Sequence, residues 1–269
     1  MQPASASNPY NPTNIVLSAS DLQKLLLPWG HDGVVRDINI FRKAFVHRSY
    51  CVRKNENCIT GNVNCPDDCL PLQEESNERL EFLGDSVLGI IIARYLFERF
   101  PDENEGFLTK MRTKLVNGQM LGHLASIIDL GKYVILSSQI EECEGRASVR
   151  ILEDCLEAFI GAMFLDNESN LDKVSNWIIG LIEQNLDFSE LIVLETNHKD
   201  MMLKHYQQSF GYIPKFFDVS ADACGKQKMY IVCAKDNKGV VIGKGQGRTK
   251  KQAENDCSLN IIAQHKIGV

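Results

Sequence analysis

The sequence of 269 residues has no apolar run long enough to cross a membrane, because its longest one, residues 87–97, is short and contains Arg94. The opening residues MQPASASNPYNPTN show no basic start followed by an apolar stretch, so we expect no signal peptide. We expect residues 1–20 to form a disordered tail instead. With 44% hydrophobic and 24% charged residues, the composition predicts a globular protein without a membrane partner.

The cysteine content argues against a disulfide framework. The nine cysteines are an odd number, and Cys155, Cys233 and Cys257 lie within apolar helix or strand patterns. Buried, reduced thiols are typical of proteins kept in a reducing compartment. We therefore predict a cytoplasmic protein, with the nucleus left open as an alternative.

An excess of positive charge, which many nucleic-acid-binding proteins carry, is missing from the chain as a whole, whose net charge is −6. The charge is unevenly divided, however. Residues 196–269 contain 12 Lys or Arg and 6 Asp or Glu, a net +6, whereas the remainder contains 17 and 29, a net −12. This asymmetry predicts a division of labour, in which a basic module binds a polyanion and an acidic body binds metal ions.

Hydrophobic periodicity predicts an all-α domain over residues 21–188. Short helices are expected within residues 21–50, and a polar, aperiodic segment at 51–76 predicts a surface loop insertion. Apolar residues then recur at helical spacing in four stretches, which are residues 77–100, 105–129, 149–165 and 171–186.

A small α+β domain is expected over residues 198–269, after a linker at 189–197. Its pattern predicts a helix, three strands and a helix, an α-β-β-β-α order. Thr249 and Gln252 fit a capping box at the start of the last helix. The strand candidates are residues 216–219, 229–234 and 240–244, and the two helices are residues 198–210 and 249–264.

Two carboxylate pairs stand out on the predicted helices. Glu81 and Asp85 are four residues apart, and Asp154 and Glu157 are three apart, so each pair shares one helix face. The alternative interpretation is that these residues are exposed members of amphipathic helices. Both helices are apolar nearly all round, however, and an unpaired carboxylate in apolar surroundings is costly. A hard divalent cation with oxygen ligands, of which Mg²⁺ is usual with phosphate substrates, is the natural partner.

These motifs resemble those of the ribonuclease III family. NERLEFLGDSVL (77–88) is similar to the family signature, and HRSY (47–50), EGFLTKMRTKLV (105–116) and LEDCLEAFIGAMFLD (152–166) follow in the family's order and spacing. The resemblance implies a divalent-metal-dependent endonuclease that cuts double-stranded RNA and leaves 5′-phosphate and 3′-hydroxyl ends. It implies that the catalytic and metal-binding residues are Glu81, Asp85, Asp154 and Glu157.

The resemblance also implies a cofactor, a partner and further site residues. The cofactor would be Mg²⁺, with Mn²⁺ as a substitute, and Glu78 and Glu105 match two further acidic positions near the cleft. Phe82 matches an aromatic residue that packs into the partner subunit of a homodimer, although an ordinary core aromatic is the alternative. A different function also stays open, namely a duplex-RNA-binding protein that acts mainly by sequestration.

The basic module contains GKGQGRTKKQAE at residues 243–254. Lys250 and Lys251 fall in the first turn of the last helix, where side-chain charge and the helix dipole together suit a phosphate. Solvated surface lysines are the alternative. Residues 198–266 resemble a double-stranded-RNA-binding domain, which implies phosphate contacts for these two lysines.

The same resemblance places Lys204 and His205 at minor-groove positions and Lys226 in the loop between the first two strands. This chain departs from the family's pattern at these positions. The family usually has Gln-Glu at 204 and 205 and a His at 226, so the minor-groove contacts are less securely assigned than the phosphate contacts.

Four cysteines lie in the predicted insertion, namely Cys51, Cys58, Cys65 and Cys69. They invite comparison with a zinc site, but they lack the paired C-x₂-C spacing of common zinc sites. We therefore expect plain loop cysteines.

Overall fold

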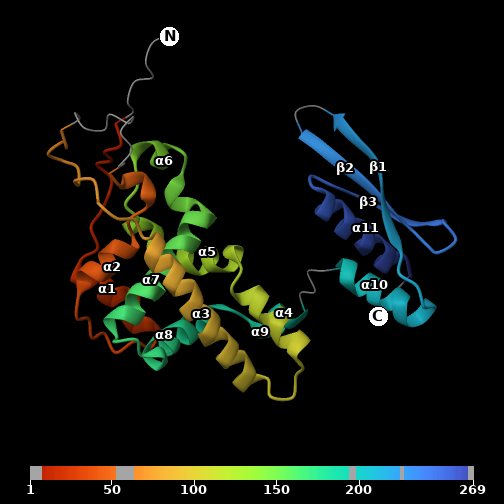
Figure 1. Ribbon diagram of the computed structural model, residues 1–269, viewed down its shortest axis with the longest axis horizontal. Helices are drawn as coiled ribbons and strands as arrows, with labels where there is room; N and C mark the ends of the chain where they lie inside the picture. Colours follow the sequence, from red (N-terminus) through yellow and green to blue (C-terminus); the bar gives the residue numbers. More distant parts are fainter. Residues whose placement is uncertain (1–7, 53–63, 194–197, 225–226, 266–269) are drawn as a thin grey trace, which may run out of the picture. The chain divides into compact units, whose positions relative to one another are not determined.

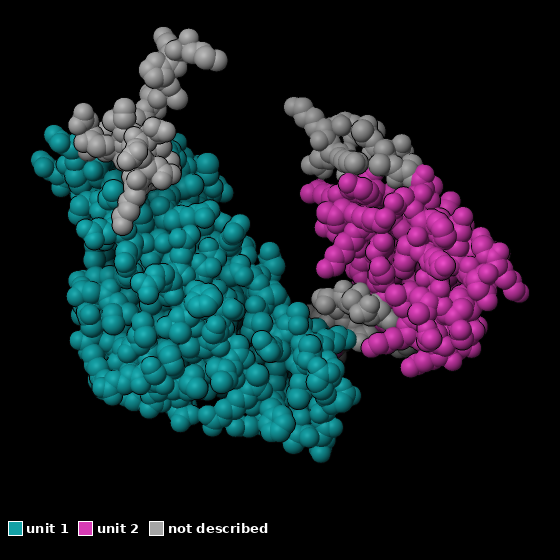
Figure 2. Space-filling view, in the orientation of Figure 1, with its two compact units in different colours: residues 1–191 teal, residues 192–269 magenta. Residues whose placement is uncertain are grey.

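The computed structural model describes residues 8–52, 64–193, 198–224 and 227–265 (Figure 1). The chain divides into two compact units, Met1–Leu191 (unit 1) and Ile192–Val269 (unit 2), which are coloured separately in Figure 2. The predicted fold class is confirmed, because unit 1 is helical and unit 2 has the order α-β-β-β-α. In the described part of the chain, no helix is both long and apolar enough to cross a membrane.

Unit 1 is built from helices joined by short 3₁₀ turns. The stretch 105–129 contains two helices, because the side chain of Asn117 interrupts it and accepts a hydrogen bond from the backbone of Met120 at the start of the second. The α-helices are α1 (Ala19–Leu26), α2 (Ile38–Ala44), α3 (Glu78–Arg99), α4 (Glu105–Leu115), α5 (Gly118–Ile127), α6 (Ser138–Glu142), α7 (Val149–Asp166), α8 (Leu171–Asn185) and α9 (Phe188–Val193), whose last two residues fall in unit 2.

The core of unit 1 gathers around α7, which packs against α2, α3 and α5. Every residue from Cys155 to Met163 is buried, and all of them except Glu157 are apolar, so this part of α7 is apolar on nearly all sides. Phe159 lies against Trp177 of α8 with 5.4 Å between ring centroids, and the Trp177 ring donates a hydrogen bond to the Leu25 carbonyl. This packing makes α7, which carries Asp154 and Glu157, the central element of unit 1.

The N-terminal segment differs from the expected disordered tail. Asn11 is buried and donates its amide to the Leu136 carbonyl at 3.0 Å. The guanidinium of Arg146 donates to the side chain of Asn14 at 2.9 Å, and Ser18 caps α1 through the Asp21 backbone. Residues 8–20 therefore belong to unit 1, while residues 1–7 lie outside the described residues.

The insertion predicted at residues 51–76 is pinned at its base. The backbone of Val52 donates to Gln73, and the backbone of Gln73 donates to Tyr50. Residues 53–63, including Cys58, lie outside the described residues. Cys51, Cys65 and Cys69 are free thiols.

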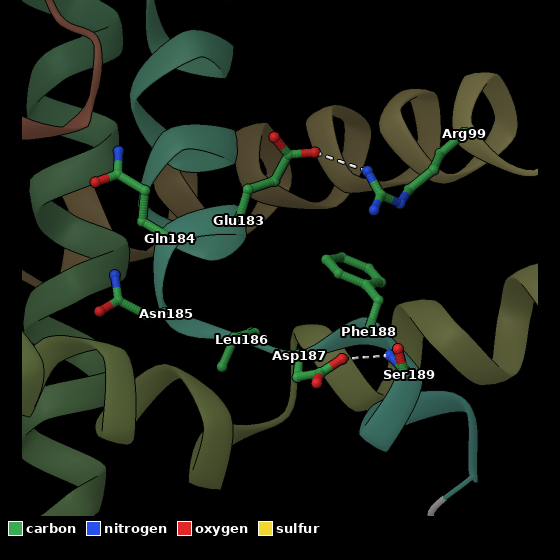
Figure 3. A pocket seen from close by; sticks show the side chains of 8 residues that line it. All are labelled: Arg99, Glu183, Gln184, Asn185, Leu186, Asp187, Phe188 and Ser189. Carbon is green, nitrogen blue, oxygen red and sulfur yellow. Dashed lines mark hydrogen bonds and ion pairs between the residues drawn. The ribbon is translucent and has the colours of Figure 1, made fainter.

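Helix α9 occupies part of the expected linker at 189–197, and Leu191 is packed into the core of unit 1. Figure 3 shows the anchor of this segment, a hollow of about 670 Å³ between the end of α3 and the turn from α8 to α9. Arg99 pairs with Glu183 at 2.8 Å, and its guanidinium carbon lies 4.5 Å from the centroid of the Phe188 ring. Since the charge of Arg99 is already paired and stacked, we interpret this region as a structural anchor.

Unit 2 is a three-stranded antiparallel sheet with two helices, α10 (His198–Phe210) and α11 (Lys250–His265). The strands are β1 (Lys215–Cys224), β2 (Gln227–Lys235) and β3 (Val241–Gly247), in the order β1-β2-β3. Helix α11 packs against β2 and β3 and beside α10, as Figure 1 shows. The small core contains Met202, Tyr206, Ala234, Cys257 and Ile261.

The glycines of the GKGQG segment serve this packing. A side chain at Gly245 would place its first carbon 2.1 Å from the backbone nitrogen of Cys257, and one at Gly243 would lie 2.3 Å from Ile261. Only glycine allows α11 to lie this close to β3. The glycines thus let α11, which begins with Lys250 and Lys251, pack closely along β3.

Candidate active site

The two predicted acidic helices, α3 and α7, touch through their backbones. A first side-chain carbon at Gly84 would lie 1.7 Å from the Glu157 carbonyl oxygen, and one at Gly161 would lie 2.3 Å from the Leu80 carbonyl oxygen. These glycines therefore allow a closer approach of the helices than any other residue would. Gly84 lies between Glu81 and Asp85 in the sequence, so this contact brings the first acidic pair to Glu157.

Glu157 is the most buried of the four carboxylates, with 9% of its surface exposed. Burial, followed by the negative charge of Asp85 and of other nearby carboxylates, raises the pKa of Glu157 to about 8. A carboxyl group with this pKa holds a proton near neutral pH unless positive charge is supplied. The site thus gathers more negative charge than it can keep ionised by itself.

The pKa values of Glu81 and Asp154 are raised as well, in each case mainly by burial. The charge of Asp154 adds to the effect on Glu81, which shows that the two acidic pairs share one electrostatic environment. Arg150 opposes the increase at both residues, and Arg48 opposes it at Asp154. Carboxylates from α3 and α7 are therefore brought together as the sequence predicted.

None of these four carboxylates forms an ion pair or a side-chain hydrogen bond with a residue that the structure describes. The one fully buried, unpartnered side-chain N or O atom in the described residues is Oδ1 of Asn255, far along the sequence in unit 2. The Glu157 oxygens also lack a hydrogen-bond partner but are not among these fully buried atoms, so they are accessible to a small ion or to water. Unpaired oxygen ligands of one charge suit a hard divalent cation.

The described residues do not form a ready-made metal site, because no group of three or more His, Cys, Asp or Glu is arranged to hold an ion. Mg²⁺ usually keeps several of its waters and takes only one or two carboxylates directly. The donor set therefore fits Mg²⁺ in its chemistry, and these carboxylates would hold the ion directly or through its waters.

The two further acidic positions are placed differently. Glu78 lies in the first turn of α3, 3.6 Å from Arg48, and its charge raises the pKa of Glu81 and Asp154. Glu105 begins α4, accepts a hydrogen bond from Thr109, and is not among the charges that raise the pKa of Glu81, Asp154 or Glu157. Within one chain, the structure brings Glu78 to the site but not Glu105.

Glu153 is a site residue that the sequence reasoning missed. Its charge raises the pKa of Glu81 and Glu157, and its carboxylate lies over Gly118, where an added carbon would be 2.4 Å from Oε2. Glu153 lies four residues before Glu157, so the two share one face of α7. The spacing of four residues between Glu153 and Glu157 is the signal in the sequence that could have identified it.

Phe82 is 79% exposed, which rules out the ordinary core aromatic that was its alternative. Ile90 and Phe97 are also exposed, by 54% and 71%, and lie on the same side of α3 at spacings of eight and seven residues. Phe82, Ile90 and Phe97 form an apolar stripe, which we call the α3 stripe. Apolar side chains exposed along one side of a helix are candidates for an interaction surface.

The basic residues of unit 2 gather at the start of α11. The predicted capping box is present, because the Gln252 backbone donates to Thr249 Oγ1 at 3.2 Å and its side chain accepts from the Arg248 backbone at 3.1 Å. Lys250 and Lys251 are both exposed in the first turn. They stand where the helix dipole and free backbone N–H groups favour an anion.

The other expected RNA contacts lie elsewhere in unit 2 or outside the described residues. Lys204 is exposed on α10, and His205 is half-buried with its ring 6.0 Å from the rings of Tyr206 and Phe210. Lys226 lies outside the described residues.

Comparison with known proteins assigns a family to each unit. Residues 37–182 match the family model described as Ribonuclease-III-like, and residues 201–265 match the one described as Double-stranded RNA binding motif. The chain is 33% identical over 227 residues to ribonuclease 3 of Chlorobium luteolum, which covers 84% of this chain and 81% of the relative. It is 34% identical over 259 residues to a probable ribonuclease 3 of Acanthamoeba polyphaga mimivirus, covering 95% of this chain and 47% of that longer protein.

Among solved structures, the nuclease domain of ribonuclease III from Campylobacter jejuni is 30% identical, with a TM-score of 0.49. The similarity covers 61% of this chain and 98% of that domain.

Proposed function

The chain belongs to the ribonuclease III family and is an endoribonuclease of double-stranded RNA, and we propose that four carboxylates form its metal-binding and catalytic centre. They are Glu81, Asp85, Asp154 and Glu157. The observation that carries this proposal is the backbone contact at Gly84 and Gly161, which gathers these groups although none of them forms an ion pair with a described cation. The metal is Mg²⁺, with Mn²⁺ as a substitute that also prefers carboxylate oxygens.

The chemistry of the centre follows from its charge. When bound, Mg²⁺ neutralises charge on the phosphate and lowers the pKa of the attacking water. Glu157 gives up its proton in the presence of a cation, because positive charge favours the ionised form of a buried carboxyl group. Glu81, Asp85 and Asp154 are held in place by the helix contact and fix the position of the positive charge relative to the RNA strand.

Water attacks phosphorus, and the bond from phosphorus to the 3′ oxygen breaks. The 3′ oxygen takes up a proton, so the products carry a 3′-hydroxyl and a 5′-phosphate. Glu78 supports the centre from the start of α3 through its pair with Arg48. Glu105 joins the site only when a second chain brings it near.

Unit 2 carries the duplex-binding role of the protein. Lys250 and Lys251 contact RNA phosphates from the start of α11, and Lys204, His205 and Lys226 supply further contacts. Duplex-binding domains of this kind recognise A-form shape, phosphates and 2′-hydroxyls with little sequence preference. The protein acts in the cytoplasm, in keeping with the free thiols of its described cysteines.

The active form is a homodimer formed through the α3 stripe. One chain supplies one carboxylate centre, whereas a duplex has two antiparallel strands related by local two-fold axes. A two-fold dimer places one centre against each strand, and closed two-fold dimers are the commonest oligomers. The exposure of Phe82, next to the catalytic Glu81, supports this interface.

Replacing one carboxylate tests the centre. In Glu157→Ala we expect cleavage of labelled duplex RNA in Mg²⁺ to fall at least about 100-fold, since the replaced group acts on the transition state. Duplex binding should stay nearly unchanged, because unit 2 is a separate compact unit. Glu142→Ala, which removes an exposed glutamate of α6, serves as the matched control and should cleave normally.

Substantial Mg²⁺-dependent cleavage by Glu157→Ala would show that Glu157 is not part of the catalytic centre. Cleavage by the wild type that persists in EDTA would show that the reaction does not depend on a metal ion. The alternative function, sequestration of duplex RNA, predicts that Glu157→Ala protects duplex RNA in cells as well as the wild type does.

A further inference from the structure

One of the two lysines at the start of α11 is already paired within unit 2. The ammonium of Lys250 lies 2.9 Å from a carboxylate oxygen of Asp218 on β1, where the two form an ion pair and a hydrogen bond. Both side chains are more than half exposed, so the pair is accessible to solvent and to a ligand. Asp218 lies on the first edge strand of the sheet, directly before the irregularity in its pairing with β2.

Lys251, the next residue, differs from Lys250 in this respect. It is exposed, lies in the same turn, and has no ion pair with any residue that the structure describes. The two lysines thus share their helix position but differ in their partners. This difference makes Lys251 an internal reference for Lys250.

The ion pair and an RNA phosphate need the same ammonium group. A carboxylate at 2.9 Å cancels much of the positive charge that Lys250 presents to an approaching phosphate. It also adds a negative charge close to the phosphate itself. Binding therefore exchanges one anionic partner for another, and the gain from the lysine contact is reduced by the interaction that is lost.

We propose that Asp218 competes with RNA phosphates for Lys250 and so weakens the hold of unit 2 on duplex RNA. The inference rests on the proposed role of Lys250 as a phosphate contact. When RNA leaves, the carboxylate takes the place of the phosphate at the lysine. Asp218 therefore speeds dissociation of the duplex, which helps an enzyme that must release its products.

A double-mutant cycle on the full chain tests the proposal. The binding probe is a duplex RNA of about 16 base pairs, the length one such domain spans, in a Glu157→Gln background that prevents cleavage. Asp218→Asn keeps the size of the side chain and removes its charge. We expect its dissociation constant near 0.1 M salt to fall about two- to five-fold, the range of an exposed ion pair.

The gain must depend on Lys250. In a Lys250→Ala chain, Asp218→Asn should change the dissociation constant by less than the gain seen with Lys250 present. Asp256→Asn, which removes the same charge further along α11 and keeps an acceptor for the Gln246 backbone, should give little gain. Lys251→Ala should weaken binding more than Lys250→Ala, because no pair offsets the contact of Lys251.

The outcomes separate the inference from the proposed function. If Lys250→Ala leaves the affinity unchanged, the proposed phosphate contact of Lys250 is wrong, and the inference falls with it. If Lys250→Ala weakens binding but Asp218→Asn does not tighten it, only the competition is wrong. If Asp218→Asn tightens RNA binding equally with and without Lys250, the effect of Asp218 is only a general repulsion of the RNA phosphates, and the inference is overturned.

Discussion

In unit 1, acidic side chains from α3 and α7 gather where the two helices touch, whereas in unit 2 the lysines lie exposed at the start of α11. Three of the four acidic groups are at least partly buried, which raises their pKa, and none of the four forms an ion pair with a described residue. The lysines are solvated, and one of them is paired with Asp218. The acidic centre therefore depends on backbone geometry, and the basic surface depends on charge that can rearrange.

This difference predicts how each unit responds to change. A centre made by direct helix contact should be sensitive to a single carbon atom. A surface made by exposed charge should respond gradually to salt and to the loss of one side chain.

The largest effect is expected from Gly84→Ala. The added carbon would lie 1.7 Å from the Glu157 carbonyl oxygen, so α3 and α7 must move apart. We expect the free energy of unfolding to fall by about 3 kcal/mol and cleavage to be lost, as measured by denaturant titration and a duplex-cleavage assay. Gly89→Ala on the same helix is the control, because its added carbon would meet only Arg112 at an ordinary 3.6 Å and should not destabilise the fold. Equal stability of the two variants would contradict the contact-built centre.

The effect of Glu157→Gln on stability should depend on pH, which sharpens the comparison between the two units. The folded-state pKa of Glu157, about 8, is above its ordinary 4.5, so the stability associated with the neutral carboxyl group is present below pH 4.5 and lost as the pH rises through 8. Gln cannot ionise. Without metal, we expect Glu157→Gln to melt several degrees higher than the wild type at pH 8.5 and at nearly the same temperature at pH 4.

Melting followed by circular dichroism in EDTA measures this difference. Lys251→Gln is a suitable comparison in unit 2, since an exposed charge should give no such pH-dependent gap. A gap that stays constant from pH 4 to 8.5 would show that Glu157 is not held in an unfavourable environment.

Phe82→Asp tests whether the apolar α3 stripe forms an interface between two chains. A buried charge at an aromatic anchor should weaken the dimer by about 2 kcal/mol, roughly 30-fold in the dissociation constant. Sedimentation at several concentrations measures the change. Phe217→Asp, at another exposed aromatic residue in unit 2, is the control and should leave the assembly unchanged. A wild type that sediments as a monomer at working concentration would disprove the dimer.

The smallest effect per residue is expected at the lysines. Removing both Lys250 and Lys251 should weaken binding to all duplex sequences alike. It should also make the plot of log affinity against log salt shallower by roughly one unit for each lost contact. Filter binding at several salt concentrations measures this slope. An unchanged slope would place the RNA contacts on another face of unit 2.

Much of the fold could be predicted from the sequence, because periodicity reports which face of an element is buried. The carboxylate pairs were visible for the same reason, since residues three or four apart on a helix share a face. The capping box of α11 was also visible, because its partners are three residues apart. These features all depend on neighbours close in the chain.

The features that were not predicted depend on partners far apart in the chain. The N-terminal segment belongs to unit 1 because Asn11 and Asn14 bond to groups more than 100 residues away. Glu153 is an exception, because its spacing of four residues to Glu157 places both on one face of α7 and could have been read from the sequence. Asp166 was not recognised either, although it is buried and accepts hydrogen bonds from the backbone of Arg36 and Asp37. Polar contacts of this range leave no period in a sequence.

The contact between α3 and α7 also has a genetic consequence. At Gly84 and Gly161 the nearest obstacles are carbonyl oxygens of the opposite helix, which every amino acid carries. A larger residue at either glycine therefore cannot be rescued by a smaller side chain across the interface. In a screen for suppressors of Gly84→Ala, true revertants should dominate, and compensating substitutions in the facing segment of α7 should be missing.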